Sequence, residues 1–221
     1  MYEVRATKLE EPTGNVVGLA SMVVDNKFAF NSIKIIKNND ESKGLFVSMP
    51  SYRSKSGEYI DFFHPTTKEM YAAVQEAVLL AYASGQTVNI GENEKTNITT
   101  YVEAHDYENS KGRVTMFLDK NFVCNTIHVK EDGRNEGNLF VAMPSYQAKD
   151  GTYKSYCNPV SKEFYEEFNK DIMQKYEASV AKAAEKYQVS IKPEEKDISV
   201  AAPNVPSPNA PSPSVPKPTS R

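Results

Sequence analysis

The alternation of apolar and polar residues over positions 1–65 predicts a series of short β-strands. Stretches rich in β-branched side chains are separated by turn-forming clusters, of which Asp25-Asn26-Lys27 is the clearest. Between Phe30 and Ile33 the apolar positions change phase, which indicates a β-bulge. We therefore expect five strands and a polar loop over 51–58. The strands are Glu3–Leu9, Val16–Val24, Phe28–Ile36, Leu45–Met49 and Tyr59–Phe63.

After Pro65 the pattern changes to the spacing of a helix. The segment Thr66-Thr67-Lys68-Glu69 fits a capping box in which Thr66 caps the helix and Glu69 reaches back to it. Apolar residues then recur every three or four positions, so a helix with one buried face is expected. These residues are Met70, Val74, Ala77, Val78 and Ala81.

The chain repeats itself at an offset of 94 residues. LFVSMPSY at Leu45–Tyr52 returns as LFVAMPSY at Leu139–Tyr146, and 14 of 27 positions are identical between 45–71 and 139–165. A gapless match of this length indicates a tandem duplication of one small domain. In the second copy Val160 replaces Thr66, so Ser161 is the expected helix cap.

The duplication sets the expected domain organisation. Unit 1 is placed at residues 2–84, a linker at 85–95, and unit 2 at 96–178 with a helical extension to about residue 187. Residues 188–221 are expected to form a Pro-rich disordered tail, because 8 of the 13 prolines lie in 193–221. This tail fits a spacer or a docking segment for a proline-recognising partner.

The expected fold class is α+β, with two tandem units that each combine a small antiparallel sheet and a C-terminal helix. A linker of about a dozen residues gives the units a high effective concentration for each other. We therefore expect them to pair within the chain as an intramolecular pseudo-dimer.

Unit 1 carries a succession of motifs that runs through most of its length. They are Val23-Val24-Asp25, Gly44-Leu45-Phe46-Val47-Ser48-Met49-Pro50-Ser51, Gly57-Glu58, Asp61 and His64-Pro65. This succession resembles the stage V sporulation protein G (SpoVG) family. Unit 2 shares Leu139–Ser145 and Gly151 but has Asn158 in place of the histidine. The resemblance implies a small bacterial protein that dimerises, binds nucleic acid and regulates septation, sporulation or gene expression.

The resemblance also implies that basic residues after Met-Pro-Ser and at the helix opening contact nucleic acid. Phosphate contacts supply most of the non-specific affinity of such proteins. Tyrosines at the same places are suited to stacking on bases, and the alternative interpretation is that they pack against the sheet. The candidates are Tyr52, Arg53, Lys55, Lys68 and Tyr71 in unit 1, and Tyr146, Lys149, Lys154, Lys162 and Tyr165 in unit 2.

The charge of the two units leaves a second function open. Residues 1–95 have a net charge of −2 and residues 96–178 a net charge of −3, which excludes a strongly basic nucleic-acid binder. Unit 2 also has Gln147 where unit 1 has Arg53. The leading hypothesis is a SpoVG-type regulator that binds DNA or RNA. The alternative is a protein–protein adaptor whose nucleic-acid surface has weakened.

Nothing in the sequence indicates an enzyme, a cofactor or a metal site. His64 is replaced by Asn158 in unit 2, so no general base repeats, and no Gly-rich phosphate loop is present. Cys124 and Cys157 replace phenylalanines of unit 1 and are expected to be inert core thiols, without a disulfide framework. The N-terminus lacks the apolar stretch of a signal peptide and no run suffices for a membrane span, so a cytoplasmic protein without membrane contact is expected.

Overall fold

The computed structural model describes residues 1–91, 95–135, 137–148 and 150–191, and it confirms an α+β fold of two repeated units. Unit 1 contains β1 (Tyr2–Thr13), β2 (Val16–Val24), β3 (Phe28–Lys37), a 3-10 turn (Glu41–Lys43), β4 (Leu45–Ser48), β5 (Ser51–Arg53), β6 (Tyr59–Asp61), β7 (Phe63–Pro65) and α1 (Lys68–Ser84). Unit 2 contains β9 (Ile98–Tyr107), β10 (Ser110–Leu118), β11 (Phe122–Glu131), β12 (Leu139–Ala142), β13 (Ser145–Gln147), β14 (Tyr153–Ser155), β15 (Cys157–Pro159) and α2 (Lys162–Ile191). Between the units lies β8 (Val88–Ile90).

Tight turns join the central strands of both units. Asp25 and Asn26 have φ angles of 48° and 51°, and Asp119 and Lys120 have φ angles of 48° and 62°. Two consecutive left-handed residues give the turn that matches the twist of an antiparallel pair. The turn predicted at Asp25 is therefore confirmed, and its counterpart in unit 2 has the same backbone.

The predicted phase change in the third strand is a β-bulge. Ala20 lies opposite Ile33 and Met22 lies opposite Phe30, so β3 holds one more residue than β2 over this stretch. Ser32 has a φ angle of 64° at the bulge. Because the bulge shifts the alternation by one residue, Phe30 and Ile33 are both completely buried on the same side of the sheet.

Helix α1 begins one residue later than the capping box predicts. Thr67, rather than Thr66, caps α1, and its Oγ1 accepts a hydrogen bond from the Met70 amide at 3.1 Å. The hydroxyl of Thr66 donates instead to the carbonyl of Lys120 in unit 2. The prediction of Ser161 as the cap of α2 is confirmed, since its Oγ accepts from the Phe164 amide.

Each unit contributes one short strand to the sheet of the other unit. β7 of unit 1 pairs with β11, where His64 lies opposite Val123, and β15 of unit 2 pairs with β3, where Asn158 lies opposite Ala29. The prediction of one strand over Tyr59–Phe63 is wrong, because the Phe62 amide donates to the Pro50 carbonyl and separates β6 from β7. The loop predicted over 51–58 likewise contains β5 of a two-stranded hairpin.

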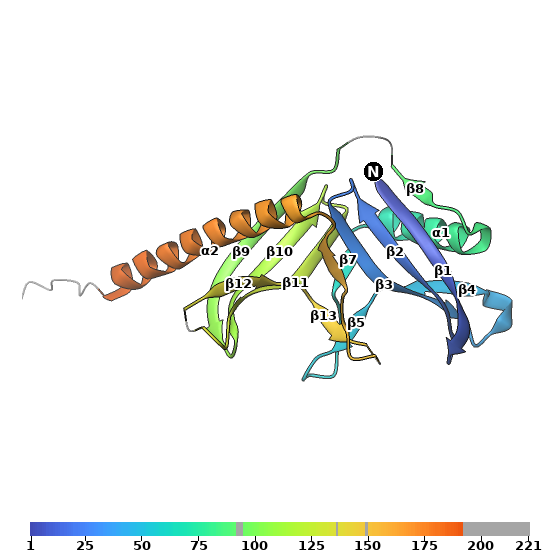
Figure 1. The fold of residues 1–221 in the computed structure, drawn as a ribbon, viewed down its shortest axis with the longest axis horizontal. Coiled ribbons are helices and arrows are strands. Elements are labelled where there is room, and N and C mark those ends of the chain that lie inside the picture. The colour runs from blue at the N-terminus through green and yellow to red at the C-terminus, as the bar shows by residue number, and fades with distance from the viewer. Residues whose placement is uncertain (92–94, 136, 149, 192–221) are drawn as a thin grey trace, which may run out of the picture.

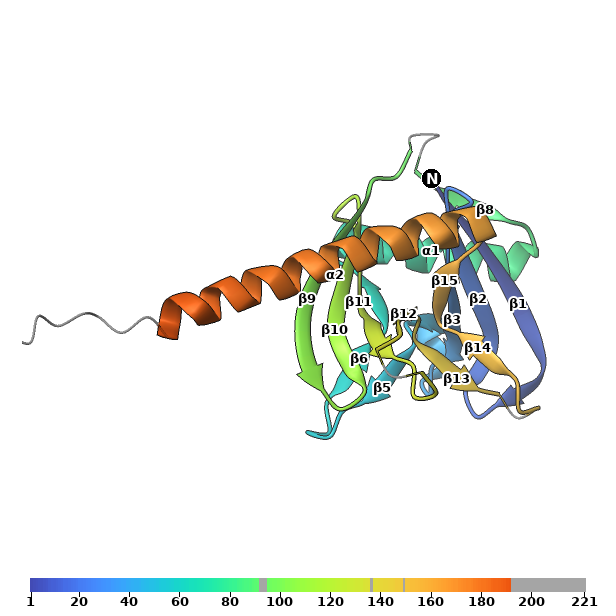
Figure 2. The ribbon, with the colours of Figure 1, turned by 60° about the vertical axis from the view of Figure 1, so that its left-hand side comes forward.

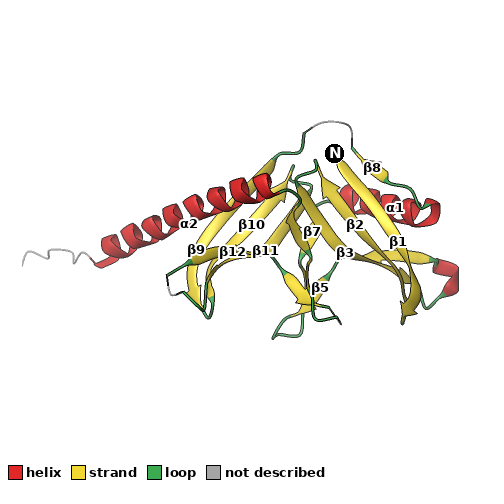
Figure 3. Cartoon of the chain, in the orientation of Figure 1, coloured by secondary structure: helices red, strands yellow, loops and turns green. Residues whose placement is uncertain are grey.

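The exchange produces two antiparallel sheets that are joined at the middle of the molecule (Figure 1). One sheet has the order β15-β3-β2-β1-β8 with β4 on β3, and the other has the order β12-β11-β10-β9 with β7 on β11. One helix packs on each sheet, α1 against β1, β4 and β8 and α2 against β9 and β12 (Figure 3). Within the described residues, no helix covers the other face of either sheet.

A continuous core fills the space between helices, sheets and the exchanged strands. At its centre the rings of Phe30 and Phe63 lie 4.7 Å apart, and both are completely buried. Cys124 and Cys157 occupy the equivalent places of unit 2, also completely buried. Burial of these aromatic and thiol side chains ties the two units into one folded body.

Regular secondary structure is also present outside the two predicted units, in the linker and at the beginning of the tail. β8 lies in the predicted linker and adds to the edge of β1, with Ile90 opposite Tyr2. α2 continues well past unit 2 to Ile191 and runs beyond its sheet (Figure 2). Residues 192–221, which make up most of the predicted tail, lie outside the described residues. Among those that are described, no helix combines the length and the apolar character needed to cross a bilayer.

Candidate nucleic-acid interface

Two hairpins project beside each other where the units meet, on the side away from the helices (Figures 1 and 2). β5 and β6 form the first and β13 and β14 the second, and each follows a Met-Pro pair. They carry five of the nine candidate residues that the structure describes. These are Tyr52, Arg53 and Lys55 on the first hairpin and Tyr146 and Lys154 on the second. The tenth candidate, Lys149, lies outside the described residues.

The other four candidates lie at the helix openings, and β7 and β15 separate them from the hairpins. Lys68 is the exposed first residue of α1, and the hydroxyl of Tyr71 donates to the Val47 carbonyl at 3.2 Å. Lys162 lies 3.7 Å from the carboxylate of Glu166. Tyr165 is 43% exposed. The structure therefore divides the candidates into two groups, and the hairpins hold the larger one.

Four aromatic rings form a row that crosses from one hairpin to the other. The ring centroids of Tyr52 and Phe62 are 5.2 Å apart, those of Phe62 and Tyr156 are 4.0 Å apart and stacked, and those of Tyr156 and Tyr146 are 4.9 Å apart. We call this set the aromatic row. Phe62 and Tyr156 were not singled out by the sequence, although their repeat offset of 94 would have drawn attention to them.

The two ends of the aromatic row differ in exposure. The Tyr146 hydroxyl lies 3.4 Å from Ser32 Oγ, and its ring is half-buried. At the other end Thr126 occupies the place of Ser32, but its hydroxyl donates to the Phe62 carbonyl at 3.0 Å. The Tyr52 ring is 41% exposed. Tyr52 is thus the most exposed ring of the row.

Beside Tyr52 lies a cavity of about 270 Å³ that both units line, which we call the hairpin hollow. Tyr52 and Phe62 form the wall from unit 1, and His128 and Lys130 belong to the wall from unit 2. The rest of its lining comes from unit 2. It consists of Thr126, Ala142, Met143, Pro144 and Ser145. The hollow has aromatic rings on one side and the His128 imidazole and Lys130 ammonium groups on the other. This lining suits a ligand with a flat ring and a negative group.

Charged groups around the hairpin hollow are partly neutralised. Burial and the neighbouring charges of Lys130, His105 and Arg113 lower the pKa of His128. The Lys55 ammonium lies 3.6 Å from the Glu108 carboxylate of unit 2. Nearby Tyr107 and Glu108 raise the pKa of Lys55, so it keeps its charge. Among the residues that line the hollow, Lys130 therefore supplies the ammonium group that an anion would meet.

Arg53 and Gln147 have the same backbone contact in the two hairpins. Arg53 Nε donates to the Gly57 carbonyl and Gln147 Nε2 donates to the Gly151 carbonyl, both at 3.2 Å. Their positions differ mainly in charge. This pair therefore isolates the contribution of one positive charge to any anion bound at the hairpins.

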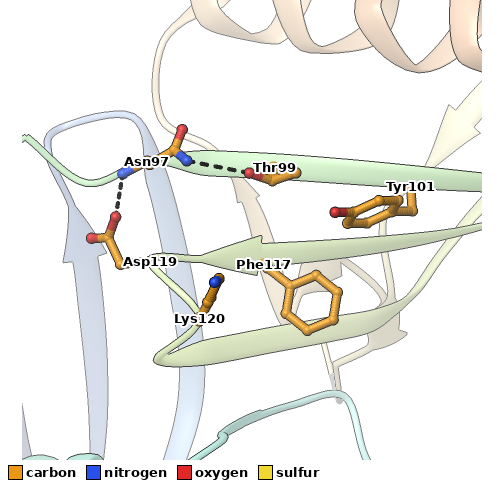
Figure 4. A pocket seen from close by; sticks show the side chains of 6 residues that line it. All are labelled: Asn97, Thr99, Tyr101, Phe117, Asp119 and Lys120. Carbon is orange, nitrogen blue, oxygen red and sulfur yellow. Dashed lines mark hydrogen bonds between the residues drawn. The ribbon is translucent and has the colours of Figure 1, made fainter.

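A second cavity lies on the helix-free face of the unit 2 sheet (Figure 4). Its volume is about 490 Å³, and the Tyr101 and Phe117 rings meet edge to face in it at 5.9 Å. Lys120 also lines it, and the Asn97 amide donates to Asp119 at its end. Thr7 and Val23 stand at the aromatic positions in unit 1, so this cavity belongs to unit 2 alone.

Comparison with known proteins follows the same division into two units. The sequence model of the SpoVG family matches residues 1–84 and again residues 94–178. A protein of Macrococcus caseolyticus named septation protein SpoVG is 34% identical over 104 residues, which are 47% of this chain and 87% of that protein. One of Archaeoglobus fulgidus with the same name is 41% identical over 84 residues, 37% of this chain and 95% of that protein. A third, septation protein SpoVG 2 of Listeria monocytogenes, is 37% identical over 89 residues, 40% of this chain and 79% of that protein.

Proposed function

Because the chain belongs to the SpoVG family, with the family model matched twice, we propose that it is a cytoplasmic, non-enzymatic regulator of septation or sporulation that binds single-stranded nucleic acid. The observation that carries this proposal is the exposed Tyr52 ring at the end of the aromatic row, facing His128 and Lys130 across the hairpin hollow. An aromatic ring beside an ammonium group, here that of Lys130, is the arrangement that binds an unpaired base together with its phosphate.

In this proposal one base enters the hairpin hollow and stacks on Tyr52. The ring of Tyr52 is held by its contact with Phe62, so little side-chain freedom is lost on binding. Lys130 lines the hollow and contacts one flanking phosphate, and Arg53, which follows Tyr52 on β5, contacts another phosphate along the same hairpin. A duplex offers no free base face, so single strands are preferred over double strands.

The negative net charge predicts that this binding is weak and depends only modestly on salt concentration. The whole chain has a net charge of −3, so long-range attraction to nucleic acid is absent and local contacts supply the affinity. Each phosphate contact on a single strand adds about 0.7 to the slope of log affinity against log salt. Few contacts therefore predict a shallow but measurable slope.

The test compares Arg53→Ala with Gln147→Ala, using fluorescence anisotropy of labelled random-sequence DNA and RNA over a salt series. Arg53→Ala should weaken binding for all sequences and lower the salt slope by about 0.7, whereas Gln147→Ala should change neither. Tyr52→Leu should weaken single-strand binding roughly 5- to 150-fold, the effect of losing one base stack. Tyr59→Leu is its control, because Tyr59 is 76% exposed on the same hairpin and does not line the hollow.

The competing function is a protein–protein adaptor, and one observation favours it. Two of the cations near this surface already have carboxylate partners, Lys55 with Glu108 and Arg113 with Glu103 at 2.7 Å. If the wild-type chain binds no oligonucleotide even at low salt, or if Arg53→Ala and Gln147→Ala have equal effects, the nucleic-acid proposal is wrong and the adaptor remains.

A further inference from the structure

The two cysteines of the chain meet at the centre of the molecule. Cys124 lies on β11 and Cys157 on β15, and their Sγ atoms are 3.5 Å apart. Both side chains are completely buried, although the two residues are 33 positions apart in the sequence. The contact therefore results from the tertiary fold and not from local sequence.

The repeat shows what this position holds in unit 1. Phe30 and Phe63 are the equivalents of Cys124 and Cys157, and their rings are in contact at 4.7 Å. Strand exchange places Cys157 opposite Phe30 and Cys124 opposite Phe63. Unit 2 thus has two facing thiols in the place where unit 1 has two facing rings.

The geometry brings the sulfurs close to bonding distance. A disulfide requires an S–S separation of about 2.05 Å, so the two atoms must approach by about 1.5 Å. The chain contains no other cysteine that competes for either thiol. A shift of this size is within the reach of side-chain rotation and small strand movements.

We propose that Cys124 and Cys157 are an oxidative modification site that forms a reversible intramolecular disulfide in the presence of a hydroperoxide. The thiolate of Cys124 attacks one peroxide oxygen, so that an S–O bond forms, the O–O bond breaks and hydroxide leaves. The thiolate of Cys157 then attacks the resulting sulfenic sulfur, the S–S bond forms and the S–O bond breaks. Two thiols lose two electrons and two protons, and one hydrogen peroxide becomes two waters.

The hydrogen bond between the thiols supports this order of events. Either thiol can be the donor of this bond, and with Cys157 as the donor the bond lowers the pKa of Cys124 and favours its thiolate. The same bond and burial raise the pKa of Cys157 well above its usual value. Cys157 gains its nucleophilic role only after Cys124 has been oxidised and that bond is lost.

The disulfide connects two strands that belong to different sheets. β15 has only three residues and pairs with β3 of unit 1, whereas β11 is a central strand of unit 2. The link would anchor β15 to its own unit while β15 pairs with the other. Oxidation therefore strengthens the attachment of the two units to each other.

The experiment treats the folded full-length chain with hydrogen peroxide, removes the oxidant with catalase, and alkylates in urea with N-ethylmaleimide before mass spectrometry. The expected product is a monomer lighter by two hydrogens that takes up no maleimide, and digestion should yield linked peptides that contain Cys124 and Cys157. Dithiothreitol should restore both alkylation sites. The melting temperature of the oxidised chain should exceed that of the reduced chain by several degrees. Peroxide should cause no such rise in the Cys157→Ala variant.

A second measurement asks whether the fold favours the link. In glutathione buffers the disulfide should form at a ratio of oxidised to reduced glutathione at least tenfold lower for the folded chain than for the chain in urea. The proposal is overturned if both thiols still take up maleimide after the peroxide treatment, or if only sulfinic acid or linked dimers appear. An equal ratio in urea and in buffer would also overturn it, because the folded contact would then contribute nothing.

Discussion

Two equivalent glycines allow a quantitative test of how closely the helices pack on the sheets. Gly18 on β2 lies under the Tyr82 ring of α1, and Gly112 on β10 lies under the Tyr176 ring of α2. A Cβ atom at Gly18 would lie 2.6 Å from Tyr82 Cε2 and 3.0 Å from the Thr7 carbonyl oxygen. At Gly112 the nearest Tyr176 atom would be 3.0 Å away, so the second site is less crowded.

The expected effect of Gly18→Ala combines two opposing terms. Overpacking costs about 1–3 kcal/mol, since the Tyr82 ring must move and its hydroxyl contact with the Val17 carbonyl at 3.4 Å is disturbed. Alanine also restricts the unfolded chain, which stabilises by about 0.4–1 kcal/mol. The net loss should lie between about 0 and 2.6 kcal/mol, with a central value of about 1.3 kcal/mol, which lowers the melting temperature by roughly 3–5 °C. For Gly112→Ala the two terms should nearly cancel.

Urea unfolding followed by far-UV circular dichroism measures both variants against the wild type. Tyr82→Leu provides the internal check, because a shorter side chain leaves room for the methyl group of Gly18→Ala. The double variant should then lose less stability than the sum of the two single variants. Equal losses at Gly18 and Gly112, or strict additivity with Tyr82→Leu, would refute the argument that ring contact sets the cost.

Three further predictions concern the titration, the caps and the assembly. Burial, followed by the charge of Asp119, raises the pKa of Tyr2 from 10.0 to about 12. The folded chain therefore holds this proton more tightly than the unfolded chain, so the free energy of unfolding should fall as pH rises from 10 to 12. Urea unfolding curves of Tyr2→Phe should lack this part of the loss. Thr67→Ala and Ser161→Ala should each cost about 1 kcal/mol by the same assay, and a cost at only one of them would contradict their equivalence as caps. Light scattering should give a monomer of 24.7 kDa, and a stable dimer of whole chains would contradict pairing within the chain.

Sequence patterns predicted those features that depend on residues close together in the chain. The turn at Asp25, the bulge before Ile33 and the cap at Ser161 each follow from local backbone preferences. Thr66 and Thr67 are both good caps, and the choice between them is made by the Lys120 carbonyl of the other unit. The local sequence does not indicate this contact between the units.

The strand exchange could not be predicted because its pairings join residues that are far apart in the sequence. β7 and β15 have three residues each, which is too short for a periodic signal, and their partners lie in the other unit. The full lining of the candidate site could not be predicted for the same reason, because it also joins residues that are far apart in the sequence. The sequence placed Tyr52 and Arg53 together in a polar loop, which is part of a hairpin in the structure. His128 and Lys130 lie beside Tyr52 only because the units interlock.

The exchange of strands also has a consequence for synthesis of the chain. Residues 28–30 of unit 1 pair with residues 157–159, so the first sheet lacks its last strand until most of the chain has been made. At about 5–20 residues per second, the ribosome needs roughly 6–25 seconds to reach that strand. During this interval residues 28–30 of β3 form an open edge that can pair with a neighbouring nascent chain, whereas residues 34–37 already pair with β4. The order of translation, and not only the final contacts, therefore decides whether two units from one chain or from two chains become joined.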